Sequence, residues 1–288
     1  MKASHVCYVG LAAVAFVGGM AKADWNPGDG HKMHYPQLPD LSTSGIDVNA
    51  TWKYPISPTA PRPFSKILAD DFRCSETGPI NDIHIWGSWL DDQVFSGTQF
   101  KLSIHADIPA ISGIPGSYSR PGPELWKAVF TPGSYLPRPL GTGATERFWD
   151  PNTNQILGTD NEVWQYNFTN IPNPFVQEEG KIYWLDVQAL VPESFPGAFG
   201  WKTTNPQVTQ HFMDDAVYGD TVDFSGPPIP QFPNPNPNDP TGLLPWRDLV
   251  YPPGAFEGQS IDLAFVITPE PVSLAGFAIA CVLLMRRK

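Results

Sequence analysis

The chain has 288 residues, including 33 prolines and 25 glycines, and its formal net charge is −11. Proline and glycine at this density interrupt regular helices, so the composition excludes an architecture of long helices. The acidic balance repels phosphate backbones and excludes nucleic acid as an expected partner, while 41% hydrophobic residues suffice for one sizeable core.

Residues 1–23 have the three parts of a secretory signal peptide. Lys2 opens the segment, an apolar run follows over residues 6–20, and Ala21 and Ala23 form a small-x-small cleavage site. We expect cleavage after Ala23 and export of the remainder. The alternative is a buried N-terminal helix, for which the glycines and the Ala-x-Ala site serve no packing purpose.

Residues 24–44 are polar and interrupted by glycine and proline, and we expect a flexible lead-in. Cys7 lies in the signal segment and Cys281 in the tail, which leaves Cys74 as the one cysteine of the exported body. No disulfide can form within the body, so its fold depends on its core. Cys74 lies in a strand-like context, and we expect a structural thiol without a catalytic role.

Short apolar segments bounded by turn residues follow, and each predicts a β-strand. They are 65–72, 81–90, 99–108, 125–133, 163–171, 181–190, 197–203, 215–220 and 260–268. Alternation is visible where Leu102 and Ile104 share one face, and again in the segment that contains Tyr183, Leu185 and Val187. Nine strands without a convincing helix predict an all-β fold, an antiparallel β-sandwich of the jelly-roll kind.

The proline-rich stretch 225–242 has the composition of an interdomain linker. About 26 residues separate it from the C-terminal tail, too few for a second domain. The last of them form an apolar strand that we expect to complete the main sheet. The sequence therefore predicts one β-sandwich domain over residues 45–268, with residues 225–242 as a surface loop.

Three aspartate doublets are candidate ligands for calcium, which takes six to eight oxygen ligands in proteins. The doublets are Asp70 and Asp71, Asp91 and Asp92, and Asp214 and Asp215. If they converge, they form a Ca²⁺ site; otherwise each one accepts backbone hydrogen bonds at a strand end. No other cofactor is expected.

The stretch WDPNTNQILGTDNE, residues 149–162, partly follows the EF-hand spacing. Asp150, Asn152 and Asn154 occupy its first, third and fifth positions. However, Gln155 stands where the loop needs glycine, and Asn161 stands where a bidentate glutamate belongs. We therefore expect a hairpin turn at residues 151–154.

Tryptophan rings can stack against sugar rings at wet sites, and Trp86, Trp89 and Trp201 are the candidates for such a platform. Trp86 and Trp89 are three residues apart on a predicted strand and should point to opposite faces. We expect one in the core and the other exposed or under a loop. His84 and His105 are expected at solvent-facing strand positions, with a zinc cluster as the alternative.

No HExxH, GxSxG, P-loop or GxGxxG motif occurs in the sequence. These absences favour a protein that is not an enzyme. Paired carboxylates could still serve glycoside hydrolysis, which needs two of them about 5 to 10 Å apart across a sugar.

The C-terminal tail, residues 269–288, has three ordered parts: Pro269, Glu270 and Pro271, then an apolar segment over 272–285, then Arg286, Arg287 and Lys288. A helix over the apolar segment would reach about 21 Å, which is marginal for the hydrocarbon core of a membrane. The basic cluster predicts a cytoplasmic C-terminus and a body outside. This tail closely resembles the PEP-CTERM sorting signal of bacteria, which implies processing by an exosortase and delivery to the cell surface or an exopolysaccharide matrix.

The body resembles, over most of its length, an uncharacterised domain of exported PEP-CTERM proteins. The stretches that carry the resemblance include DLSTSGIDVNAT, ILADDFRCSETGPINDIHIWGSWLDD, YWLDVQAL, FGWKT, DDAVYGD and QSIDLAFVI. It implies a β-rich extracellular module and brings no known activity.

The function expected from the sequence is therefore that of an exported, surface- or matrix-associated protein with a structural or adhesive role, in contact with extracellular polysaccharide. A calcium-assisted carbohydrate-binding module is the first alternative. A secreted glycan-active hydrolase is the second.

Overall fold

The computed structural model describes residues 24–54, 66–112, 117–207, 215–220 and 246–268. The predicted signal peptide, the proline-rich stretch 225–242, Asp214 and the whole tail 269–288 lie outside these residues. Within the described part of the chain, no helix is long and apolar enough to cross a membrane.

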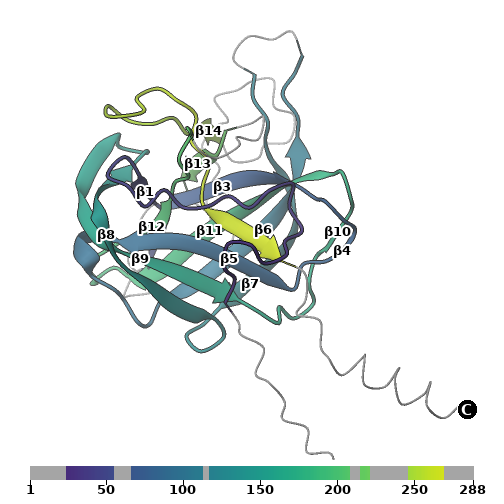
Figure 1. The fold of residues 1–288 in the computed structure, drawn as a ribbon, viewed down its shortest axis with the longest axis horizontal. Coiled ribbons are helices and arrows are strands. Elements are labelled where there is room, and N and C mark those ends of the chain that lie inside the picture. Colours follow the sequence, from purple (N-terminus) through teal and green to yellow (C-terminus); the bar gives the residue numbers. More distant parts are fainter. Residues whose placement is uncertain (1–23, 55–65, 113–116, 208–214, 221–245, 269–288) are drawn as a thin grey trace, which may run out of the picture.

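The described residues form two large, mostly antiparallel sheets (Figure 1), so the predicted all-β class is confirmed and the arrangement is consistent with a β-sandwich. The six-stranded sheet runs β12 (Phe199–Lys202), β1 (Ile46–Asn49), β8 (Leu136–Asp150), β9 (Gln155–Phe168), β5 (Asp82–Trp89), β15 (Phe265–Thr268). The seven-stranded sheet runs β14 (Arg247–Asp248), β13 (Val217–Asp220), β3 (Lys66–Arg73), β11 (Ile182–Pro192), β6 (Gln99–Ile108), β7 (Arg120–Phe130), with β2 (Thr51–Tyr54) also paired to β11. β4 (Gly78–Pro79) pairs with β10 (Val176–Gln177), and the 3₁₀ turn η1 (Leu90–Asp92) follows β5.

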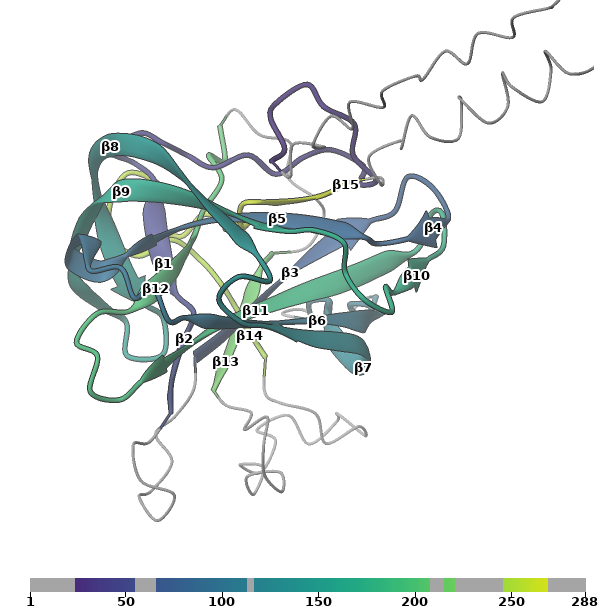
Figure 2. The same ribbon diagram turned by 90° about the horizontal axis from the view of Figure 1, so that it is seen from below.

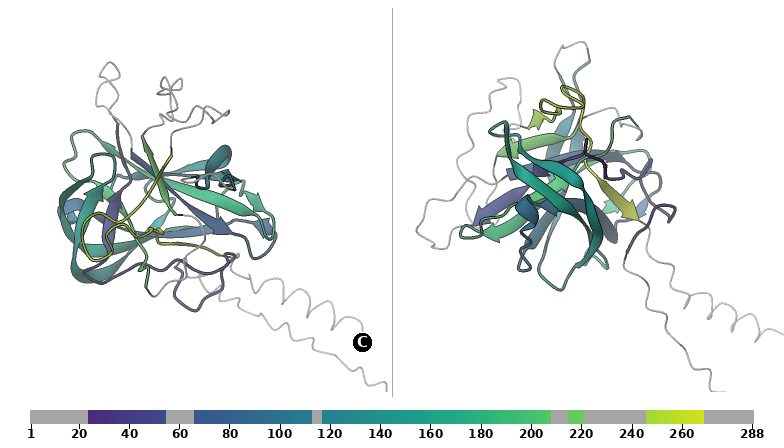
Figure 3. Two further views of the ribbon diagram at one scale, coloured as in Figure 1. Left: turned by 90° about the horizontal axis from the view of Figure 1, so that it is seen from above. Right: turned by 60° about the vertical axis from the view of Figure 1, so that its left-hand side comes forward.

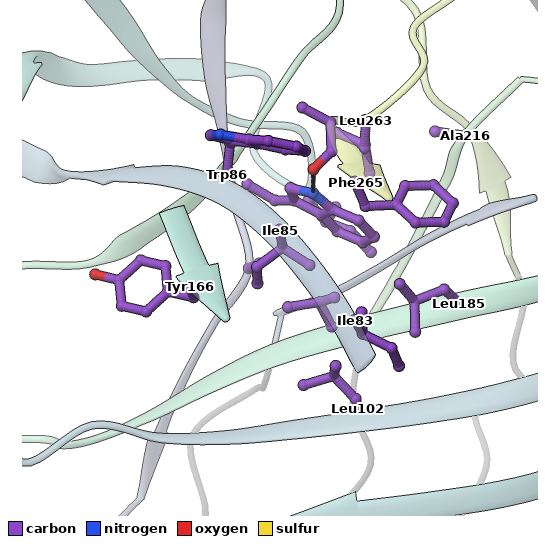
Figure 4. Close-up of a cluster of buried hydrophobic side chains, with 14 of the residues drawn as sticks. Ile83, Ile85, Trp86, Leu102, Tyr166, Leu185, Ala216, Leu263 and Phe265 are labelled. Atoms are coloured by element: carbon purple, nitrogen blue, oxygen red, sulfur yellow. Dashed lines mark hydrogen bonds between the residues drawn. The ribbon is translucent and has the colours of Figure 1, made fainter. Parts of the chain in front are cut away.

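The core lies between the two large sheets and is built by alternation along their strands. Figure 4 shows Ile83 and Ile85 of β5 beside Leu102 of β6 and Leu185 of β11, and all four side chains are buried. Ile104 is buried in the same cluster, so the face predicted for the segment 99–108 is confirmed. Each such side chain contributes about 1.5–3 kcal/mol by leaving water, which explains a fold without disulfides.

Five strands of the six-stranded sheet close into a ring at one end of the molecule. β12 pairs with β1 on one side and with β5 on the other, and the path β1–β8–β9–β5 joins the two partners. Figures 2 and 3 show the β8–β9 hairpin curling around this end, where β1 and β12 lie. Every pairing in the ring is antiparallel except β1 with β8.

The ring needs glycine where β5 and β12 meet. A Cβ added to Gly87 would lie 2.4 Å from the carbonyl oxygen of Gly200. A Cβ added to Gly200 would lie 2.7 Å from the Cβ of Asp47 and 2.8 Å from the ring of Phe148. These contacts are too close for any larger residue, so the two glycines allow the ring to close.

The segment 24–44 was predicted to be a flexible lead-in, and this expectation is wrong for the residues that pack on the body. Trp25, Met33 and Gln37 are buried. The backbone N–H of Gln37 donates to the carbonyl of Phe265 in β15 at 3.1 Å, and Met33 pairs with Cys74 through an isolated antiparallel β-bridge of the backbone. The apolar residues of this segment are scattered among polar ones and gave no periodic signal, yet Trp25 and Met33 pack in the hydrophobic core.

Candidate functional site

Each of the five strands of the ring contributes one buried polar side chain to a common cluster. Asp47 comes from β1, Ser88 from β5, Glu146 from β8, Asp160 from β9 and Lys202 from β12, and all are at most 2% exposed. One oxygen atom from each of the three carboxylates lies within 4.8 Å of the others. Three acids and one lysine therefore share a small volume without contact with solvent.

Strand alternation and register explain why these residues meet. Both neighbours of Asp47 along β1, Ile46 and Val48, lie in the hydrophobic core, so Asp47 points to the opposite side. Asp47 is the direct cross-strand partner of Lys202, and Glu146 is the direct partner of Asp160. Direct partners have Cβ atoms about 4.5–5.5 Å apart, so closure of the ring brings both pairs together.

Lys202 binds two of the three carboxylates. Its Nζ lies 3.3 Å from Asp47 Oδ2 and also contacts Glu146 Oε2. In each of these two carboxylates, one oxygen contacts the ammonium and the other does not. The buried oxygen atoms of the cluster that make no hydrogen bond of normal geometry are Asp47 Oδ1, Glu146 Oε1, Asp160 Oδ1, Asp160 Oδ2 and Ser88 Oγ. The Ser88 hydroxyl nevertheless lies close enough to the carboxylates of Asp47 and Asp160 to act on both.

Burial shifts the pKa values of Asp47, Asp160 and Lys202. It raises the pKa of Asp160 to about 9, and the charge of Asp47 acts in the same direction. It also raises the pKa of Asp47, against the opposing influence of Lys202 and the nearby Ser88. Burial lowers the pKa of Lys202, which the charge of Asp47 opposes. Charge in this cluster therefore requires compensation from within it.

The doublet Asp70–Asp71 does not form a shared site, because adjacent residues of a strand point to opposite faces. Both residues lie in β3 and are fully buried. Asp70 accepts hydrogen bonds from the Gln37 side chain at 2.8 Å and from the backbone N–H of Leu263 at 2.6 Å. This corresponds to the alternative interpretation, in which an aspartate accepts backbone bonds.

The doublet Asp91–Asp92 lies in η1, and both residues have φ of 54°. The Asp92 carboxylate accepts bonds from the backbone N–H groups of Asn161 and Glu162 at 2.8 and 2.9 Å. Partial burial would raise its pKa, but its hydrogen bonds outweigh that effect and lower the pKa. The doublet therefore fastens η1 to β9.

In the third doublet, Asp215 accepts a hydrogen bond from the Ser260 hydroxyl, and Asp214 lies outside the described residues. Among the described residues, none of the doublet side chains belongs to a group of three or more metal-ligating side chains; the cluster at Asp47, Glu146 and Asp160 is such a group. The convergence that a calcium site at the doublets would require is therefore absent from the described part of the chain.

Trp86, Trp89 and Trp201 are 3%, 1% and 0% exposed, so none of the three presents a face for stacking against a sugar. Trp89 donates to the Tyr166 hydroxyl at 2.7 Å, and Trp201 donates to a backbone carbonyl at 2.8 Å. Trp86 lies under Trp25 of the lead-in with 5.9 Å between ring centroids, in agreement with the expectation that one tryptophan of the pair is covered. Their role in the described structure is packing.

The histidines predicted at solvent-facing positions are instead mostly buried. His84 is 2% exposed and its Nδ1 lies 2.6 Å from Asn167 Oδ1; burial lowers its pKa to about 4. His105 Nε2 lies 2.6 Å from Asp186 Oδ2. Burial also raises the pKa of the Cys74 thiol to about 12, which agrees with a structural thiol.

The hairpin expected at residues 151–154 is confirmed. β8 ends at Asp150, β9 begins at Gln155, and Asn154 has the positive φ of 54° that such turns use. Asp150 Oδ1 accepts the backbone N–H of Asn152 at 3.1 Å. The same stretch also contains Asp160, which the comparison with an EF-hand had given no role.

A partly open hollow of about 610 Å³ lies beside β6, β10 and β11. Its lining includes Asp107, Phe175, Glu178, Lys181 and Tyr183. Aromatic rings beside charged and polar groups are the side chains that carbohydrate sites use. This hollow could receive a small polar ligand.

The fold and the cluster define an all-β domain of two packed sheets with a polar centre in its closed end. A family model described as a domain of unknown function (DUF7901) matches residues 33–268, and the chain belongs to this family. The expectation that the body belongs to an uncharacterised domain family is thereby confirmed. No curated protein and no solved structure matches the chain.

Proposed function

We propose that this chain is an exported protein of the cell surface or extracellular matrix, with a structural or adhesive role. The observation that supports this most directly is how the two ends of the body meet. The backbone N–H of Lys32 donates to the carbonyl of Ile267 at 2.7 Å, and Gln37 donates to Phe265 in the same strand. The N-terminal segment of the body and its last strand are thus held together.

This arrangement suits a body held by its C-terminus. β15 ends at Thr268, directly before Pro269, and pairs with β5 through four residue pairs. A force on the tail therefore acts on β15, which lies at the end of the six-stranded sheet and is paired with β5. In Figure 2, β15 lies on the opposite side of the body from β2 and β13, so tethering through the tail would present β2 and β13 away from the membrane.

The sorting proposal assigns roles to the tail by its resemblance to PEP-CTERM signals. Pro269, Glu270 and Pro271 form the recognition motif for an exosortase, and the segment 272–285 inserts in the membrane before processing. Arg286, Arg287 and Lys288 keep the C-terminus on the cytoplasmic side.

The test is deletion of residues 269–288 from the full-length chain in cells that process such tails. The body should move from the surface fraction to the medium or periplasm. A matched control, Glu179→Gln at an exposed position, should leave the distribution unchanged. Surface retention of the truncated chain at the level of the intact one would refute the sorting proposal.

A carbohydrate-binding module is the second candidate, and the hollow lined by Phe175, Lys181 and Tyr183 favours it. Binding of the full-length chain to a panel of polysaccharides, with calcium and with chelator, tests it. Loss of binding in Lys181→Ala would place the ligand in the hollow. Unchanged binding in that variant would exclude the hollow, and absence of binding to every polysaccharide would leave the structural role.

A glycan-active hydrolase is a weaker candidate. Such an enzyme needs two carboxyl groups on either side of a sugar ring. The carboxylates brought together at Asp47, Glu146 and Asp160 are at most 2% exposed and therefore do not face a substrate.

A further inference from the structure

The cluster inside the closed ring contains more acceptors than donors. Five buried oxygen atoms make no hydrogen bond of normal geometry: both of Asp160, one each of Asp47 and Glu146, and the hydroxyl oxygen of Ser88. A buried polar group without a partner destabilises the folded state, and the effect is larger when the group is charged. The Ser88 hydroxyl makes no hydrogen bond of normal geometry, but it lies close enough to the carboxylates of Asp47 and Asp160 to act on both. A neutral oxygen therefore also points into the cluster, which is an observation independent of the acidic residues themselves.

The strand register also indicates that the cluster lacks a compensating partner. Glu146 and Asp160 stand directly opposite each other on β8 and β9, and like charges at directly opposed positions destabilise a sheet. The ammonium of Lys202 contacts Glu146 and Asp47, whereas Asp160 has the neutral Ser88 hydroxyl beside it and no hydrogen bond of normal geometry. The lysine therefore leaves one member of the opposed pair uncompensated.

The charges and the atom positions of the cluster indicate which kind of ligand would compensate it. If all three carboxylates were ionised beside the ammonium of Lys202, the site would carry two uncompensated negative charges without solvent. The oxygens that Lys202 does not use, Asp47 Oδ1 and Glu146 Oε1, join the two oxygens of Asp160 as candidate ligands. A divalent cation bound by these oxygens would cancel the charge that Lys202 leaves.

We propose that Asp47, Glu146 and Asp160 bind one calcium ion inside the strand ring, with Ser88 as a further oxygen ligand. Carboxylate and hydroxyl oxygens suit hard cations. Calcium tolerates irregular geometry, whereas magnesium demands a near-ideal octahedron and retains several waters. Ligands fixed on four different strands and closed to solvent favour calcium. The site joins β1, β5, β8 and β9, so the ion would lock the ring closed.

This proposal does not depend on the sorting tail. It also differs from the calcium site first expected from the sequence, since none of the ligands comes from an aspartate doublet. The ion would act on folding and stability, because a ligand that binds only the folded state stabilises that state.

The test uses the purified full-length chain. Elemental analysis of protein prepared without chelator should find about one calcium per chain. The melting temperature should rise by ~5 °C or more in calcium relative to EGTA. Asp160→Asn keeps the shape of the side chain and should abolish this rise. The matched control Glu179→Gln removes an exposed acid and should retain it.

Ser88→Ala serves if Asp160→Asn does not fold, and should weaken calcium affinity roughly tenfold by titration calorimetry. Three results would overturn the proposal. One is an equal melting temperature in calcium and EGTA together with no bound metal. Another is an intact calcium response in folded Asp160→Asn. The third is a larger response to magnesium or manganese than to calcium.

Discussion

Replacing Asp70 with asparagine should make the free energy of unfolding depend less on pH. Asp70 is completely buried, and burial together with the charge of Asp262 raises its pKa well above the ordinary value. Hydrogen bonds from Gln37, Leu263 and the backbone of Asp71, at 2.6–2.8 Å, oppose this rise only in part.

The sign follows from proton binding. The unfolded aspartate has a pKa of about 3.9, and the folded value is higher. Between these two values the folded state binds one more proton than the unfolded state, so stability falls as pH rises. The contribution is fully present below about pH 3.9 and is lost as the pH passes the folded pKa. Within that window the slope reaches ~1.4 kcal/mol per pH unit for one proton.

Urea unfolding followed by tryptophan fluorescence at a series of pH values measures this slope. The asparagine side chain would place its NH₂ group against a hydrogen-bond donor, which lowers stability by about 1–3 kcal/mol at every pH. The informative quantity is therefore the slope of the unfolding free energy against pH. Asp70→Asn should show a shallower decline than wild type as pH rises from about 4, and the exposed control Asp29→Asn should match wild type. Equal slopes for Asp70→Asn and wild type would refute the reasoning.

Three other predictions concern packing. Burial raises the pKa of Cys74 to about 12, so a thiol reagent at neutral pH should modify Cys74 only after the chain unfolds. Mass spectrometry of the Cys74 peptide measures the modification, and equal rates in the native and unfolded chain would contradict the prediction. Gly87→Ala should destabilise the chain by about 1–3 kcal/mol in urea unfolding, because its Cβ would meet a carbonyl of β12 at 2.4 Å. Gly143→Ala, whose Cβ meets nothing closer than 3.7 Å, is the control, and an equal effect in both would be the opposing result. Trp89→Phe should cost about 1–3 kcal/mol in the same assay by leaving the buried Tyr166 hydroxyl without its donor, and a negligible change would show that this hydrogen bond adds nothing to stability.

Local patterns in the sequence were sufficient for most of the strands. All nine predicted segments overlap a strand, and the prediction for residues 99–108 coincides with β6. The reason is that period-two alternation and bounding turn residues are local properties, and burial of one face follows from them. The turn at residues 151–154 was predictable for the same reason, since its asparagines and proline act within four residues.

Two of the strands that contribute to the polar cluster, β1 and β8, were not predicted from the sequence. β1 is only four residues long and carries Asp47 between apolar neighbours. β8 contains Pro137, Pro139 and Gly141, which argue against a strand, and register shifts in its pairing with β9 accommodate them. A lone acid inside an apolar stretch was the available signal for Asp47, because a charged residue there must be paired once it is buried.

The sequence by itself determined an all-β domain with a large core and a buried thiol, because composition, alternation and turn residues act over a few positions. Only the tertiary structure decided which polar residues meet. Asp47 and Lys202 are far apart along the chain, as are Ser88 and Asp160, and closure of β12 onto both β1 and β5 unites them. The same closure buries Trp89 and Trp201. Strand order and ring closure depend on the packing of the whole chain, and no short stretch of residues encodes them.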